Sequence, residues 1–138
     1  MNLNNYTIKS QEAIQQAQLL AQSFGHQQIE NEHILKAIFE IDENVTPFIL
    51  NKLNVNIELL KNILDKQLDS FSKVSGGDIM LSKITGKTLN EASIIAKKMN
   101  DEFVSIEHLL VAIFKSKSAI SQSLKDQGII TGTENYGG

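Results

Sequence analysis

Residues 32–39 read EHILKAIF, and residues 107–114 read EHLLVAIF. A shift of 75 residues superimposes these two segments without a gap, and the same shift places residues 17–21 (AQLLA) on residues 92–96 (ASIIA). A long register of this kind is hard to obtain by chance, and it indicates one structural unit that occurs twice. The chain is therefore predicted to contain two tandem copies of one unit.

The bounds of the two copies follow from where this register begins and ends. Repeat 1 is expected at about residues 6–71 and repeat 2 at about residues 81–127, and residues 72–80 are expected to be a flexible linker. Together, residues 1–130 suit a single compact domain, because a chain of 138 residues can bury a core large enough to be stable without disulfide bonds or a structural metal. Residues 131–138 have no helical pattern and are expected to be a disordered tail or a remnant of cloning.

Each copy is predicted to begin with an amphipathic helix. Thr7 and Ser82 are equivalent candidates for its N-cap, and Gly25 and Asn100 are equivalent residues at its end that tolerate the left-handed conformation. Between them, apolar residues recur at helical spacing in both copies. The two stripes are Ala13, Ala17, Leu20, Ala21 and Phe24, and Thr88, Ala92, Ile95, Ala96 and Met99.

Further helices are predicted downstream in each copy. A second helix is expected at about 31–40 and 106–115, the later one capped by Ser105. Thr46-Pro47 predicts the start of a third short helix, Asn56 the cap of a fourth, and Ala119–Gln127 a third helix in repeat 2. The predicted fold class is all-α, with two tandem pseudo-symmetric helical repeats packed as one compact domain.

Composition excludes several function classes. The chain has no cysteine, so disulfides and thiolate metal sites are excluded. All 13 basic residues are lysine and the net charge is −3, which argues against nucleic-acid binding because such domains present a basic face rich in arginine. No apolar run reaches membrane-spanning length and no secretory signal is recognisable, so the expected location is cytoplasmic.

Three motifs that suggest chemistry have simpler explanations. Gly86-Lys87-Thr88 lacks the upstream glycine of a phosphate loop, since that position is Leu81. His33 and His108 occur once per repeat, whereas a zinc site on a helix needs two histidines one turn apart. We expect these histidines to pack at the rim and form hydrogen bonds. No nucleophile and base are paired, so the chain is predicted to be non-catalytic, with no cofactor and no metal.

The paired EHIL…AIF and EHLL…AIF segments resemble the double Clp repeat at the N-terminus of Clp ATPases. Residues 73–78 (KVSGGD), Leu81-Ser82 and residues 101–110 (DEFVSIEHLL) are most similar to the branch of the ClpB-type disaggregase chaperones. The resemblance implies a pseudo-two-fold helical domain that binds unfolded or aggregated proteins. It also implies that ATPase modules, which use ATP, belong to a full-length protein that is hexameric, whereas the isolated domain is monomeric.

The resemblance also implies substrate-binding residues at Thr7, Asp101 and Glu107, which rim a shallow apolar groove where the repeats meet. Each has a structural alternative. Thr7 serves as an N-cap, Asp101 closes a loop, and Glu107 stabilises a helix dipole. Leu89, Ile94 and Met99 are expected in the core rather than in the groove.

Glu32 and Glu107 open equivalent helices and support an alternative function. Either they stabilise the helix dipoles, or they contact basic or modified side chains of a partner. In the related ClpC branch, matching glutamates are associated with phosphoarginine recognition. The alternative is therefore a domain that docks adaptor or co-chaperone proteins or reads phosphoarginine, as in ClpC-like and ClpA-like unfoldases.

Overall fold

The computed structural model describes residues 2–74, 76–126 and 128. The predicted all-α fold class is confirmed, because the regular secondary structure of the described residues is helical except for two strands of two residues each. The elements are α1 (Ile8–Ser23), β1 (Gln28–Ile29), α2 (Asn31–Ile41), α3 (Val45–Lys52), α4 (Ile57–Ser70), β2 (Met80–Leu81), α5 (Lys83–Lys98), α6 (Ile106–Lys115) and α7 (Ala119–Asp126).

The two-fold repeat predicted from the sequence is confirmed at the level of single hydrogen bonds. The predicted N-caps act in the same way: Ser10 N–H donates to Thr7 Oγ1 at 3.2 Å, and Thr85 N–H donates to Ser82 Oγ at 3.1 Å. Both helices end on a left-handed residue, Gly25 with φ +72° and Asn100 with φ +59°. Helices α1 and α5 are therefore the same structural unit, 75 residues apart.

The repeats are joined by reciprocal strand pairing. Strand β1 of repeat 1 runs parallel to β2, which precedes α5, and pairs Ile29 with Leu81. The equivalent bridge pairs Tyr6, just before α1, with Val104 of repeat 2. In each case the N-terminal segment of one repeat lies against the loop that precedes the second helix of the other, so the repeats interlock.

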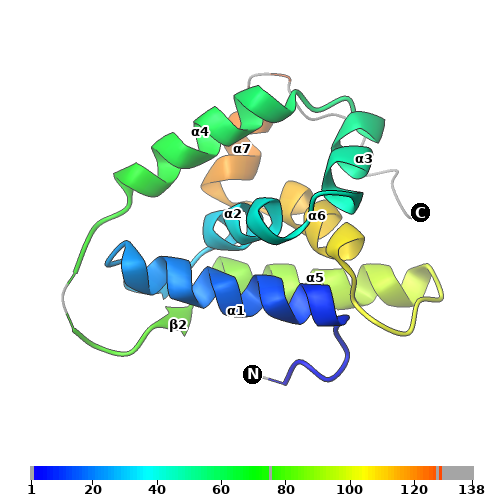
Figure 1. The fold of residues 1–138 in the computed structure, drawn as a ribbon, viewed down its shortest axis with the longest axis horizontal. Coiled ribbons are helices and arrows are strands. Elements are labelled where there is room, and N and C mark those ends of the chain that lie inside the picture. The colour runs from blue at the N-terminus through cyan, green and yellow to red at the C-terminus, as the bar shows by residue number, and fades with distance from the viewer. Residues whose placement is uncertain (1, 75, 127, 129–138) are drawn as a thin grey trace.

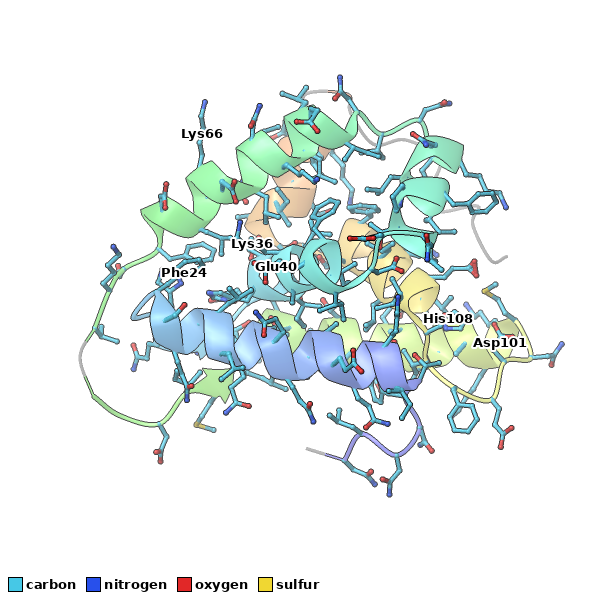
Figure 2. All side chains as sticks on the ribbon, in the orientation of Figure 1. Phe24, Lys36, Glu40, Lys66, Asp101 and His108 are labelled. Atoms are coloured by element: carbon cyan, nitrogen blue, oxygen red, sulfur yellow. The ribbon has the colours of Figure 1, made fainter. Side chains whose placement is uncertain are left out.

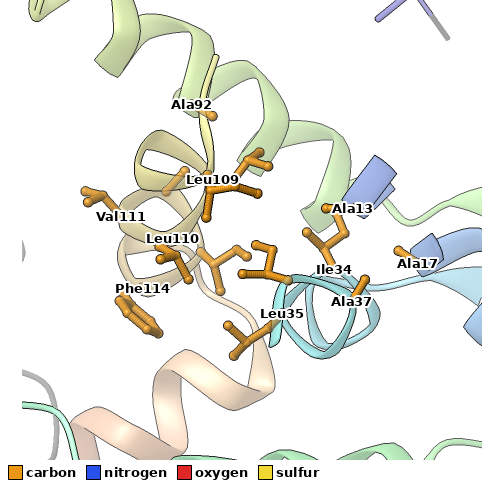
Figure 3. Close-up of a cluster of buried hydrophobic side chains, with 14 of the residues drawn as sticks. Ala13, Ala17, Ile34, Leu35, Ala37, Ala92, Leu109, Leu110, Val111 and Phe114 are labelled. Atoms are coloured by element: carbon orange, nitrogen blue, oxygen red, sulfur yellow. The ribbon is translucent and has the colours of Figure 1, made fainter. Parts of the chain in front are cut away.

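The helices form three layers (Figure 1). Helices α1 and α5 lie on one side, α2 and α6 occupy the middle and contact each other, and α3, α4 and α7 cover the opposite side. The middle helices are buried almost all round and carry the centre of the core (Figure 3). Its largest fully buried side chains include Ile34, Leu35, Leu109, Leu110 and Phe114.

Small residues let the outer layer approach the middle one. Ala13 and Ala17 on α1, Ala37 on α2 and Ala92 on α5 are fully buried (Figure 3). Short side chains at these positions allow helix axes to come close, and the larger side chains then interdigitate around them. The stripes predicted from the sequence are therefore the faces that pack.

Two local predictions are wrong. Helix α3 begins at Val45 rather than at Thr46-Pro47, because the carboxylate of Asp42 caps it and accepts the Thr46 N–H at 2.6 Å. Ile94 is 38% exposed rather than part of the core, because it lies two residues from Ala92 and thus on the outer face of α5. Leu89 is buried and Met99 is partly buried, as predicted.

Residues 86–88 lie inside α5, the helix equivalent to α1. In the part of the chain that the structure describes, no helix is long and apolar enough to cross a membrane. The same residues contain no group of three or more metal-ligating side chains arranged around one point. The predicted tail at 131–138 lies outside the described residues.

Candidate functional site

An open groove lies where α1, α3 and α6 meet, on the seam between the two repeats. It holds about 630 Å³ and is mainly apolar. Repeat 1 contributes the start of α1 and the N-terminal part of α3, and repeat 2 contributes the start of α6. The residues that line it are Thr7, Lys9, Asp42, Asn44, Val45, Phe48, Ile49, Ser105, Ile106 and Glu107.

The apolar wall of the groove comes from α3. Phe48 is 65% exposed and Val45 is 42% exposed, whereas Ile49 and Ile106 beneath them are buried. Phe48 and Val45 are three residues apart and therefore lie on one face of the helix. Large apolar side chains gathered beside a groove are typical of a surface that binds another chain.

Two of the predicted site residues meet at this groove. Thr7 and Glu107 both line it, one at the start of α1 and the other in the first turn of α6. Thr7 also caps α1, and its hydroxyl donates to Ser10 Oγ at 2.9 Å. Thr7 is thus structural and accessible at once, and a binding defect in a Thr7 variant has to be separated from loss of the cap.

Asp42 holds the wall of the groove in place. Its buried carboxylate accepts the Thr46 hydroxyl at 2.7 Å and the backbone N–H groups of Asn44, Val45 and Thr46. Burial alone would raise the pKa of Asp42, but these hydrogen bonds outweigh it and lower the pKa. Asp42 therefore stays ionised and fixes α3, with Lys9 3.4 Å away at the rim.

Asp101 does not line the groove. It lies in the loop between α5 and α6, 46% exposed, and its Oδ2 is 2.8 Å from His108 Nε2 (Figure 2). The Ser105 N–H donates to His108 Nδ1 at 2.9 Å, so the ring proton is on Nε2 and points to Asp101. Asp101 thus orients a histidine at the start of α6 that directly follows Glu107 of the groove.

The equivalent contact in repeat 1 joins two histidines. Glu30 N–H donates to His33 Nδ1 at 2.9 Å, and His33 Nε2 in turn is 2.8 Å from His26 Nδ1. His33 and His108 form the hydrogen bonds that were expected, but their expected place at the rim is wrong, because both are buried. Each histidine closes the first turn of its helix against the preceding loop.

Glu32 lies apart from the groove. It is 2% exposed, and its carboxylate accepts the Ile120 N–H at the start of α7 at 2.8 Å. Burial raises the pKa of Glu32 against the opposing effect of that hydrogen bond. Its equivalent Glu107 lines the groove instead, because Asp42 already caps α3, the counterpart of α7. The two glutamates therefore occupy different environments.

The sequence interpretation missed Phe48 and Val45. Their signal was present: both lie on the face of α3 opposite the buried Leu50. The sequence alone does not show which face of a short helix is exposed, so its apolar residues are assigned to the core by default. For this reason the exposed face of α3 was not predicted.

Residues 5–127 match the family model of the Clp repeat (R) N-terminal domain. The chaperone protein ClpB of Bacteroides thetaiotaomicron is 49% identical over 129 residues, and that of Porphyromonas gingivalis is 42% identical over 128 residues. These matches cover 94% and 93% of this chain but 15% of each relative, so the chain spans about 15% of their length.

Solved structures show the same fold at lower identity. The Hsp104 N-terminal domain from Candida albicans matches with a TM-score of 0.81 and 19% identity, over 95% of this chain and 85% of that one. A complex of the ClpV N-domain with a VipB peptide matches with a TM-score of 0.77 and 17% identity, over 98% of this chain and 86% of that one. At these identities the likeness concerns the fold alone.

Proposed function

Because the chain belongs to the Clp repeat (R) N-terminal domain family and is ClpB-like over nearly its whole length, we propose that it recognises clients for a ClpB-like, ATP-dependent protein disaggregase. In this proposal the domain binds exposed segments of unfolded or aggregated proteins. It does no chemistry and passes its clients to ATPase modules of the full-length protein.

The apolar groove beside α3 carries this proposal. Unfolded chains expose apolar segments that native proteins bury, so a surface that binds apolar segments selects non-native protein. Phe48 and Val45 offer such a surface, and Thr7 and Glu107 at the rim can hydrogen-bond the backbone of an extended client. The VipB peptide in complex with the ClpV N-domain is a precedent for peptide binding by this fold.

The expected affinity is modest. Full burial of one large apolar side chain contributes about 1.5–3 kcal/mol, and ordering a flexible client offsets much of that gain. We therefore expect a Kd in the micromolar range or weaker, about −8 kcal/mol at most. Weak binding suits a domain that must release its client, and tethering to the ATPase modules would raise the local client concentration.

Replacement of Phe48 tests the proposal. Phe48→Ala removes much of the exposed apolar wall, and we expect it to weaken binding of a labelled, permanently unfolded polypeptide by about 5- to 10-fold. Fluorescence anisotropy measures the Kd. Leu19→Ala is the matched control, because Leu19 is also highly exposed and apolar but lies on α1 outside the groove. Thermal melts verify that both variants fold like the parent.

A second titration distinguishes client recognition from the alternative function. If a phosphoarginine peptide binds and the unfolded polypeptide does not, client recognition by the groove is refuted in favour of modified-residue reading. Equal weakening by Phe48→Ala and Leu19→Ala would also refute it, since binding would then not depend on the groove. Weaker binding of the unfolded polypeptide to Phe48→Ala, but not to Leu19→Ala, supports the proposal.

A further inference from the structure

A second pocket lies at the opposite end of α6 from the apolar groove. It holds about 380 Å³ between α5 and the C-terminal end of α6, and its walls carry three lysines and one glutamate. Since α6 has 10 residues, the two sites are about 15 Å apart along the helix. The residues that line the pocket are Ile84, Lys87, Thr88, Glu91, Ala112, Lys115, Ser116 and Lys117.

The charge of this pocket is opposite to that of the matching surface in repeat 1. Moving back by 75 residues replaces Lys87, Lys115 and Lys117 with Glu12, Glu40 and Asp42. In repeat 1 two of those carboxylates are engaged, because Gln16 donates to Glu40 at 3.0 Å and Asp42 caps α3. The two repeats have the same helical arrangement, so the fold itself does not require lysines at these positions.

The lysines of the pocket have no acidic partner within the described part of the chain, where no carboxylate lies within 4.0 Å of their ammonium groups. Lys115 lies in the last turn of α6, where the helix dipole stabilises a positive charge, and this partly accounts for a lysine at that position. Lys87 lies in the middle of α5, and Lys117 lies beyond the end of α6, so the dipole explains neither. The domain as a whole is acidic, with a net charge of −3.

A buried amide is anchored by the walls of the pocket. Asn31 of α2 is fully buried, and its Nδ2 donates to Thr88 Oγ1 at 2.8 Å and to Ser116 Oγ at 3.0 Å. Its Oδ1 is buried and has no hydrogen-bond partner among the described residues. Asn31 itself does not line the pocket, so its amide fixes Thr88 and Ser116 from behind and leaves the lysines to contact a ligand.

From this arrangement we infer that the pocket between α5 and α6 binds a short acidic segment of a partner protein. Aspartate or glutamate side chains of the segment pair with Lys87, Lys115 and Lys117. An apolar side chain of the segment packs on Ile84, which is 41% exposed. A bare phosphate would satisfy the lysines but has no apolar part to pack on Ile84.

Nucleic acid fits the pocket less well. The chain has no arginine for bidentate phosphate contacts, and no aromatic side chain lines this pocket on which a base could stack. The acidic-segment site is also separate from the proposed client groove, so one domain could hold an apolar client and an acidic partner at the same time.

Peptide binding to the 138-residue chain tests the inference. A labelled peptide of alternating glutamate and leucine is compared with its glutamine twin by fluorescence anisotropy. We expect a Kd on the order of 100 μM for the acidic peptide at low salt, weakened several-fold at high salt. Binding of the glutamine twin with equal affinity would overturn the inference.

Variants locate the binding. Lys87→Ala combined with Lys117→Ala is expected to weaken the acidic peptide at least 5-fold, and both residues are exposed, so the fold is retained. Lys66→Ala is the matched control, because Lys66 projects into solvent from α4 (Figure 2). Equal weakening by the control would show diffuse attraction and overturn the site. So would full competition by millimolar inorganic phosphate at constant ionic strength.

The two proposals can fail separately. Phe48→Ala is expected to leave the acidic peptide unaffected, and the lysine pair is expected to leave the unfolded polypeptide unaffected. Backbone amide shifts in α5 and at the end of α6 on addition of the acidic peptide support this site. Shifts confined to α3 would assign the peptide to the client groove and overturn the inference.

Discussion

At the scale of single residues, one position distinguishes the two repeats. His26 and Asp101 are equivalent, and each contacts the equivalent buried histidine, His33 or His108, at 2.8 Å. The imidazole of His26 and burial together lower the pKa of His33 to about 4, burial being the larger cause. The pKa of His26 is lowered as well, again mainly by burial. Repeat 1 therefore holds a neutral histidine pair.

This pair predicts acid sensitivity. A histidine whose pKa is lower in the folded state gives stability that is present above its unfolded pKa, near 6.5, and lost as the pH falls towards 4. For His33 the loss amounts to about 2–3 kcal/mol of unfolding free energy. His26→Asp supplies the carboxylate found in repeat 2, and we expect it to reduce this loss. Urea denaturation between pH 7 and 4.5 measures it.

The control for this prediction is Gln27→Asp. Gln27 is exposed and adjacent in sequence, so the variant adds the same charge outside the pair. The slope of stability against pH is compared rather than stability itself, because a buried aspartate has a cost of its own. The same slope in His26→Asp and in the parent would mean that other groups govern the acid response. Lys73, Asp69 and Glu30, whose charges act on His26, are the first to consider.

At the scale of elements, the helix starts show which helix boundaries can be predicted from neighbouring residues. Thr7, Ser82 and Asn56 were predicted as caps and cap their helices, because each supplies its own oxygen to an amide three residues later. The start of α3 was misplaced because its cap, Asp42, lies four residues before the amide that it bonds. The start of α7 could not be predicted from nearby residues, because Glu32, 88 positions earlier, accepts the Ile120 N–H.

Glu32 provides a test of this long-range cap. The pKa of Glu32 is raised by burial, so its folded state favours the protonated form, and its contribution to stability is lost as the pH rises through that pKa. Glu32→Gln keeps an acceptor for Ile120 without the buried charge. We expect Glu32→Gln to be at least as stable as the parent at pH 7. We expect Glu32→Ala, which leaves the N–H unpaired, to lose about 1–3 kcal/mol.

Urea denaturation at pH 5 and pH 7 measures both variants, with Glu58→Gln as the control. Glu58 is exposed in the first turn of α4, so its replacement removes a helix-dipole charge without changing burial. A Glu32→Gln variant that is much less stable than the parent at pH 7 would mean that the ionised carboxylate is needed at α7.

At the scale of the whole molecule, the repeat was the most predictable property. The 75-residue register, the apolar stripes and the left-handed ends at Gly25 and Asn100 follow from local chemistry, and all are present. The groove and the basic pocket could not be predicted in detail, because each combines elements far apart in sequence. Thr7 and Glu107 were named from the family resemblance, whereas Phe48 required the orientation of α3.

One core predicts one unfolding transition. Leu110 of α6 is fully buried (Figure 3). Helix α6 contacts α2 and α3 of repeat 1 and α5 and α7 of repeat 2. We expect Leu110→Ala to lower the unfolding free energy by about 2–5 kcal/mol. Signals from α1 and from α5 should be lost together in urea, measured by amide spectra at increasing denaturant. Two separate transitions would show that the repeats are independent units.

The reciprocal strand contacts also bear on how such a chain can be divided. The N-terminal segment of each repeat pairs with the other repeat: Tyr6 pairs with Val104, and Leu81 pairs with Ile29. Cleavage of the backbone between Gly76 and Gly77 would therefore give two fragments, each without the segment that it pairs with in the intact domain. Mixed together, they have the means to reconstitute the native molecule, which makes this domain a natural scaffold for fragment complementation.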